Sequence, residues 1–226
     1  MFLSKLFARA RHERPPEPQW GTLSYAQEGE DLILASLFEG KRDGFFVDVG
    51  ACHPQRFSNT FFFHKLGWRG INIDAMPGSM EAFKKTRPGD INIEAAIAAE
   101  NVTLTYYMFN EPALNGFEQK LARARDGVAG YRITGTKQIK TRTLASILDE
   151  YLPKTHIDFL TVDAEGLDLD VLQSNDWSRY RPSLVLAESL SNRTFESNDP
   201  LSEFMRVQGY KPVAKTLRTV FFEAAA

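Results

Sequence analysis

Short apolar runs alternate with helical patterns along most of the chain, and this alternation restricts the fold more than any other feature. The run at 45–49 is almost entirely apolar, as expected of a strand that is covered on both faces. Residues 143–151 place apolar side chains at the i, i+3, i+4, i+7 spacing of an amphipathic helix. Such alternation favours a mainly parallel sheet with helices on both faces. The predicted strands are 45–49, 70–73, 91–93, 104–109, 159–162, 184–186, 210–214 and 219–222, and the predicted helices are 24–38, 59–66, 79–85, 143–151, 167–173 and 201–208.

The last two predicted strands are joined by only a few residues around Leu217 and Arg218. Parallel neighbours need a longer crossover, so this pair must be antiparallel if the two strands pair directly. The prediction is therefore an α/β fold whose mostly parallel sheet ends in an antiparallel hairpin. This layout is expected of a methyltransferase Rossmann-like sheet and is unlike a plain dinucleotide-binding domain.

The chain has 226 residues, enough for one α/β domain and short for two. Three prolines, at 15, 16 and 18, divide an N-terminal tail and linker (1–22) from the predicted domain (23–226). The tail carries Lys5 and Arg9 among apolar residues. It fits either a frayed end or a short basic amphipathic helix.

The bulk composition excludes several classes of protein. A formal charge of -2 gives no overall attraction to nucleic acid. No apolar run approaches the roughly 20 residues needed to cross a bilayer. The single cysteine, Cys52, rules out an internal disulfide and suits a reducing compartment, so we expect a cytoplasmic protein.

The turn after the first strand contains a single glycine, Gly50. A pyrophosphate cofactor needs several glycines there so that backbone N–H groups can approach it. S-adenosylmethionine has no phosphate and needs one close backbone approach, together with an acceptor for its ammonium group, which Asp48 could provide. The second predicted strand ends at Asp74, placed to accept hydrogen bonds from ribose hydroxyls. The alternative is that Asp74 caps the following helix.

Acidic residues also follow two later strands. Asp163 and Glu165 come after the strand at 159–162, and Glu188 follows the next one. We call Asp163, Glu165 and Glu188 the acid rim. These carboxylates could supply a general base, or they could bind a divalent cation such as Mg²⁺. The competing interpretation is a satisfied polar cluster in which Asp163 or Asp168 caps a helix.

Cys52 and His53 follow the glycine turn, and neither belongs to an acyl-transfer motif. Cys52 is interpreted as a small packed residue, whereas His53 could face the cleft as a base.

These motifs resemble the FkbM family of S-adenosylmethionine-dependent methyltransferases from about Ser24 to the C-terminus. The most specific stretches are Gly67-Trp-Arg-Gly-Ile-Asn-Ile-Asp74 and Asp158-Phe-Leu-Thr-Val-Asp-Ala-Glu-Gly-Leu-Asp168. Ser24-Tyr-Ala-Gln-Glu-Gly-Glu-Asp31, Phe46-Val-Asp-Val-Gly-Ala-Cys-His-Pro54 and Ser58-Asn-Thr60 also match.

The resemblance implies a class I methyltransferase Rossmann-like fold with a seven-stranded sheet, and O-methylation of a hydroxyl on a sugar, a glycan, or a sugar-bearing or polyketide small molecule. It implies catalytic roles for Asp163 and Glu165, and the positions of Glu188 and His53 add two further candidates. Gln27 and Asp31 are expected to close over the cofactor. The expected cofactor contacts are Gln27, Asp31, Asp48, Gly50, Ala51, Asn59, Asp74 and Asp163.

Two other functions fit an α/β domain. An NAD-dependent sugar dehydrogenase or epimerase would need a glycine-rich turn, and a short-chain type would also need a tyrosine and a lysine four residues apart on a helix. Neither occurs in this sequence. A non-catalytic nucleotide-binding module is disfavoured by the acid rim, since unpaired buried carboxylates are costly. The unpatterned stretch 110–137 could form a lid in which Arg125 and Tyr131 bind a polyol acceptor.

Overall fold

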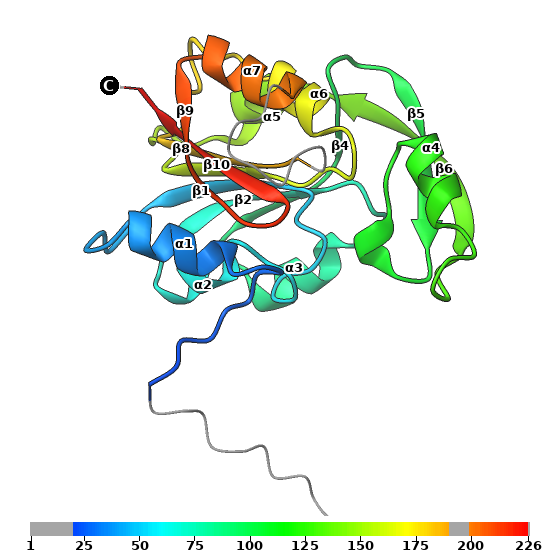
Figure 1. Ribbon diagram of the computed structural model, residues 1–226, viewed down its shortest axis with the longest axis horizontal. Helices are drawn as coiled ribbons and strands as arrows, with labels where there is room; N and C mark the ends of the chain where they lie inside the picture. Colours follow the sequence, from blue (N-terminus) through cyan, green and yellow to red (C-terminus); the bar gives the residue numbers. More distant parts are fainter. Residues whose placement is uncertain (1–19, 190–198, 226) are drawn as a thin grey trace, which may run out of the picture.

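The computed structural model describes residues 20–189 and 199–225, and its centre is a seven-stranded sheet (Figure 1). The strand order is β3-β2-β1-β7-β8-β10-β9, and every neighbouring pair is parallel except those that β10 makes with β8 and β9. The predicted seven-stranded sheet with its closing antiparallel hairpin is therefore confirmed. The strands are β1 Phe45–Val49, β2 Arg69–Asp74, β3 Ile91–Glu94, β7 Phe159–Val162, β8 Leu184–Glu188, β9 Tyr210–Lys215 and β10 Thr219–Ala224.

Helices cover both faces of this sheet, as Figure 1 shows. The helices on one face are α1 Glu30–Leu37, α2 Phe61–Lys65 and α3 Met80–Thr86, and those on the other are α5 Leu144–Tyr151, α6 Asp168–Gln173 and α7 Pro200–Val207. Successive residues of a strand point to opposite faces of the sheet, so their side chains contribute to two hydrophobic cores. Phe46 and Phe159 pack with Trp68 in the first core, while Val47 and Leu160 belong to the second.

A second, three-stranded sheet lies beside the first, in the order β4-β6-β5. Its strands are β4 Ala96–Ile97, β5 Thr103–Phe109 and β6 Ile133–Arg142. Between β5 and β6 runs a stretch that we call the 110–132 segment, which contains the short helix η1 (Pro112–Leu114) and α4 (Gln119–Arg125). The stretch that the sequence left unpatterned is thus ordered structure attached to the edge of the domain.

The predicted helix at 24–38 begins only at Glu30. Gly29 adopts a left-handed backbone (φ 85), and the buried Asp31 carboxylate accepts hydrogen bonds from Ser24 Oγ (2.6 Å) and the Tyr25 N–H (2.7 Å). Asp31 therefore folds the preceding residues back as a loop, and this loop carries Gln27. Within the described residues, no helix has the length and apolar composition needed to cross a bilayer. The predicted tail lies almost wholly outside the described residues.

Candidate active site

A partly open cavity lies at the carboxyl ends of β1, β2 and β7 and contains about 840 Å³ of empty space, some of it open to solvent. This size and this position are typical of ligand sites in open α/β sheets. The cavity brings together five of the residues for which the sequence predicted a catalytic or binding role, from four separate segments of the chain. They are Gln27, Gly50, Asp74, Asp163 and Glu165.

Gly50 is needed for the close approach of two strand ends. Its backbone is left-handed (φ 86), and a Cβ built on it would lie 1.8 Å from the Asp163 carbonyl oxygen. The space beside Gly50 is therefore filled by the protein's own backbone. Gly50 and Asp163 are held together at one wall of the cavity.

We expect Gly50→Ala to destabilise the fold by about 3 kcal/mol or more, because overpacking and a left-handed alanine both carry a cost. Gly40→Ala is the matched control, since Gly40 is also left-handed (φ 81) but its Cβ would meet no atom within 4 Å. That control should lose only about 1 kcal/mol. Chemical denaturation measures both, and equal losses would contradict the steric argument.

Asp74 joins the loops that follow β1 and β2. Its Oδ2 accepts the Cys52 N–H (3.0 Å) and its Oδ1 accepts the Met76 N–H (2.8 Å). Burial raises the pKa of this carboxyl group. Asp74 does not cap a helix, because α3 starts only at Met80. Each carboxylate oxygen can accept a further hydrogen bond, and the residue lines the cavity.

Asp163 is the acid of the rim that directly follows β7. The residue lines the cavity and is exposed to the solvent within it. Burial raises its pKa well above the ordinary aspartate value, and the negative charge of Glu188 raises it further. Glu188 lies outside the cavity wall. Burial, followed by the charge of Glu165, raises the pKa of Glu188 to about 7.

Asp168 and Glu165 shape the turn that follows β7. The Asp168 carboxylate accepts the N–H groups of Ala164 (3.1 Å) and Gly166 (3.3 Å), so it holds the turn closed. Burial raises the Asp168 pKa to about 6. Glu165 has a left-handed backbone (φ 49) and forms an ion pair with Arg125 of α4, with 2.6 Å between Nη1 and Oε2. Asp168 therefore organises the turn before α6, and neither Asp163 nor Asp168 caps this helix, whose N-cap is Leu167 with no side-chain hydrogen bond.

Within residues 20–189 and 199–225, no group of three or more histidine, cysteine, aspartate and glutamate side chains is arranged to hold a metal ion. The arrangement of Asp163, Glu165 and Glu188 therefore does not fit the Mg²⁺ site that the sequence left open as one of two alternatives. One oxygen of Glu165 is already bound to Arg125.

Several predicted contacts lie outside the cavity wall. Asp48 is buried and accepts the Thr60 hydroxyl (2.7 Å), and Asn59 donates to Thr161 Oγ1 (3.0 Å). His53 is exposed, and its Nδ1 accepts the N–H groups of Gln55 and Arg56 (3.1 and 3.0 Å). Burial lowers the His53 pKa and raises that of Asp48 to about 6. Ala51 and Asp31 are buried away from the cavity as well.

Cys52 lines the cavity, and its N–H binds Asp74. Burial and the nearby aspartates raise the pKa of its thiol to about 12, so the thiolate form is scarce at neutral pH. This agrees with the interpretation of Cys52 as a packed residue rather than a nucleophile.

Sequence reasoning suggested a lid at 110–137, but neither Arg125 nor Tyr131 lines the cavity, and the residues of this segment and of β5 that do line it were missed. Tyr106 packs against Phe117 with 4.8 Å between ring centroids, and both line the cavity together with Pro112, Asn115 and Gly116. Arg56 and Glu111 form a two-point ion pair (2.9 and 3.0 Å) that joins this segment to the loop after β1. Oppositely charged residues 55 positions apart give no local sequence signal for such a pair.

Comparison with family models matches residues 48–212 to the FkbM methyltransferase domain. Comparison with curated proteins gave no significant match. A TehB-like S-adenosylmethionine-dependent methyltransferase from Corynebacterium glutamicum is 11% identical, with 87% of each chain covered and a TM-score of 0.44. The 1,6-didemethyltoxoflavin-N1-methyltransferase of Burkholderia thailandensis, solved with its acceptor and S-adenosylhomocysteine, is 13% identical (TM-score 0.40), covering 87% of this chain and 77% of that one. At such identities no residue role transfers to this chain.

Proposed function

The chain belongs to the FkbM methyltransferase family, and on that premise we propose that it transfers a methyl group from S-adenosylmethionine to a hydroxyl oxygen. The proposed acceptor is a sugar, a glycan, or a sugar-bearing or polyketide small molecule. Family membership favours methyl transfer over the dehydrogenase or epimerase alternative. The supporting observation is that one cavity is lined by both Asp74 and Asp163.

The cavity walls suit the parts of the proposed cofactor. Asp74 keeps acceptor capacity for ribose hydroxyls beside the apolar surfaces of Met76, Ala95 and Ile97, which suit the flat face of adenine. Gln27 and Gly50 line the same cavity as Asp163, and we place the methionine end there. Bound in this way, S-adenosylmethionine would supply an electrophilic methyl carbon on a good leaving group.

The acid rim is proposed to take the acceptor's proton. A sugar hydroxyl has a high pKa, so a base must remove its proton as the oxygen attacks. A base works best when its own pKa is near the working pH, and burial together with mutual repulsion moves Asp163 and Glu188 in that direction. Asp163 faces the cavity, so we assign it the contact with the hydroxyl.

The experiment is a thermal shift assay with S-adenosylhomocysteine and NAD in parallel, followed by a panel of sugar acceptors. S-adenosylhomocysteine at about 100 times its Kd should add roughly 2.7 kcal/mol of stability, which is several degrees in Tm. The product should carry an O-methyl group, identified by mass and by NMR. Stabilisation by NAD alone, or methylation of nitrogen or carbon, would contradict the proposal.

A further inference from the structure

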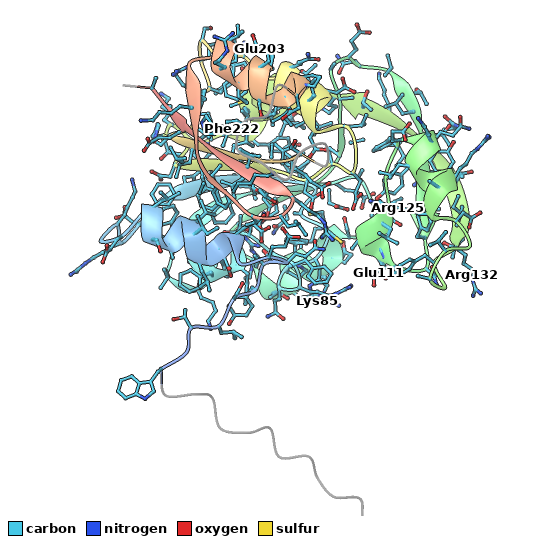
Figure 2. All side chains as sticks on the ribbon, viewed as in Figure 1. Lys85, Glu111, Arg125, Arg132, Glu203 and Phe222 are labelled. Carbon is cyan, nitrogen blue, oxygen red and sulfur yellow. The ribbon has the colours of Figure 1, made fainter. Side chains whose placement is uncertain are left out.

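We propose that Arg125 is a positioning residue, which holds Glu165 at the edge of the cavity and joins α4 to the turn after β7. The proposal rests on the proposed methyl transfer, in which the acid rim takes the acceptor's proton. Arg125 belongs to the 110–132 segment, whereas Glu165 follows a strand of the main sheet. Figure 2 shows Arg125 and Glu111 on the side of this segment that faces the main sheet, with Arg132 pointing away.

Glu165 needs such a partner because its surroundings repel it. The charges of Asp163, Asp168 and Glu188 all interact unfavourably with the Glu165 carboxylate. Its left-handed backbone adds strain that a residue with a Cβ rarely accepts. Without a nearby cation, the side chain would lower its energy by turning away from the rim toward solvent.

Arg125 reaches Glu165 in a largely covered position. The Arg125 side chain is 24% exposed and that of Glu165 is 17% exposed, so solvent screens their attraction less than it would for a surface pair. Two further close approaches, each between a glycine and a glutamate, lie between the 110–132 segment and the turn after β7. A Cβ on Gly116 would lie 3.0 Å from Glu165 Cβ, and a Cβ on Gly166 would lie 3.2 Å from Glu118 Cβ.

The junction also places the cavity wall. Asn115, Gly116 and Phe117 line the cavity immediately before α4, and Glu165 lines it next to Gly116. A shift of α4 would therefore move both the wall and the acid rim. Because precise placement of reacting groups controls transfer rates, we assign Arg125 an effect on the transfer step rather than on cofactor binding.

The test compares Arg125→Gln, Arg125→Lys and Arg123→Gln. Arg123 is the matched control: it lies on the same helix, is exposed, and takes part in none of the ion pairs found among the described residues. With an acceptor from the sugar panel, Arg125→Gln should lower kcat roughly 10- to 100-fold and leave the Kd of S-adenosylhomocysteine within about two-fold. Arg125→Lys should restore most of the rate, and Arg123→Gln should match the wild type.

A second measurement needs no turnover. Hydrogen exchange of the peptides covering 110–126 and 160–170 should speed up about 10-fold in Arg125→Gln and stay unchanged in Arg123→Gln. Unchanged hydrogen exchange in Arg125→Gln would overturn the proposed role of Arg125. Absence of methylation with every acceptor would instead count against the proposed function, and the exchange measurement would still test Arg125. A proportional loss of S-adenosylhomocysteine binding, or no rescue by lysine, would also overturn the proposed role of Arg125.

Discussion

Asp163→Asn is expected to lower the rate of methyl transfer by roughly 10²- to 10⁴-fold, the usual contribution of a positioned general base. Asparagine has nearly the same shape but cannot accept the acceptor's proton. Asp163 faces the cavity, so the substitution acts where the hydroxyl is proposed to bind. S-adenosylhomocysteine should still bind, because Gly50 and Asp74 are unchanged. Initial rates and a calorimetric titration measure the two effects.

The same substitution should stabilise the folded protein at pH 8. Burial and neighbouring carboxylates raise the folded-state pKa of Asp163 well above its ordinary value of 3.8. The folded state therefore holds a proton that the unfolded state releases, and stability falls as pH rises from about 4 through the raised pKa. Removing the carboxylate abolishes that loss, so the gain in Tm should be large at pH 8 and small at pH 4.

Asp43→Asn provides the control, because Asp43 is exposed in the loop before β1. It should change neither the rate nor the pH dependence of Tm. A variant Asp163→Asn that retained full activity would remove Asp163 from the mechanism. One that lost stability at pH 8 would show that the carboxylate stabilises the fold, contrary to the direction of its pKa.

The main sheet could be predicted because its strands carry local signals. The runs at 45–49 and 159–162 are short and apolar, and their bounds agree with β1 and β7. β6 was not predicted, because its sequence, Ile133-Thr-Gly-Thr-Lys-Gln-Ile-Lys-Thr-Arg142, is mostly polar and it pairs with β5 on an exposed sheet. A strand that buries little shows little hydrophobic periodicity.

The candidate site could likewise be predicted only in part from the sequence. Gly50, Asp74 and Asp163 could be placed in one cavity because each ends or directly follows a strand, and parallel strands end at the same edge of a sheet. Side-chain direction was less predictable. Asp48 lies within β1 and points to Thr60, and Asp31 binds its own loop. The Arg125–Glu165 pair spans 40 positions and depends on how α4 packs, which no local pattern encodes.

Asp74→Ala is expected to weaken binding of S-adenosylhomocysteine roughly 100-fold or more, because each hydrogen bond to a charged acceptor contributes about 1.5–3 kcal/mol. Asp74 also accepts two backbone N–H groups, so part of the loss could come from loosened loops. Glu94→Ala is the matched control. Glu94 ends the neighbouring strand and accepts the Gly78 N–H (2.7 Å), but it does not line the main cavity. Its removal should leave the Kd nearly unchanged.

A ligand lacking a ribose hydroxyl separates the two effects of Asp74. The wild type should bind S-adenosylhomocysteine about 10-fold or more tightly than its 2′-deoxy analogue, because the analogue leaves a carboxylate lone pair unused. Asp74→Ala should bind both ligands equally weakly, so the two changes together cost less than their sum. Loosened loops alone would weaken both ligands by the same factor and preserve the preference. A preference that survived in Asp74→Ala would therefore show that Asp74 shapes the pocket without contacting the ribose.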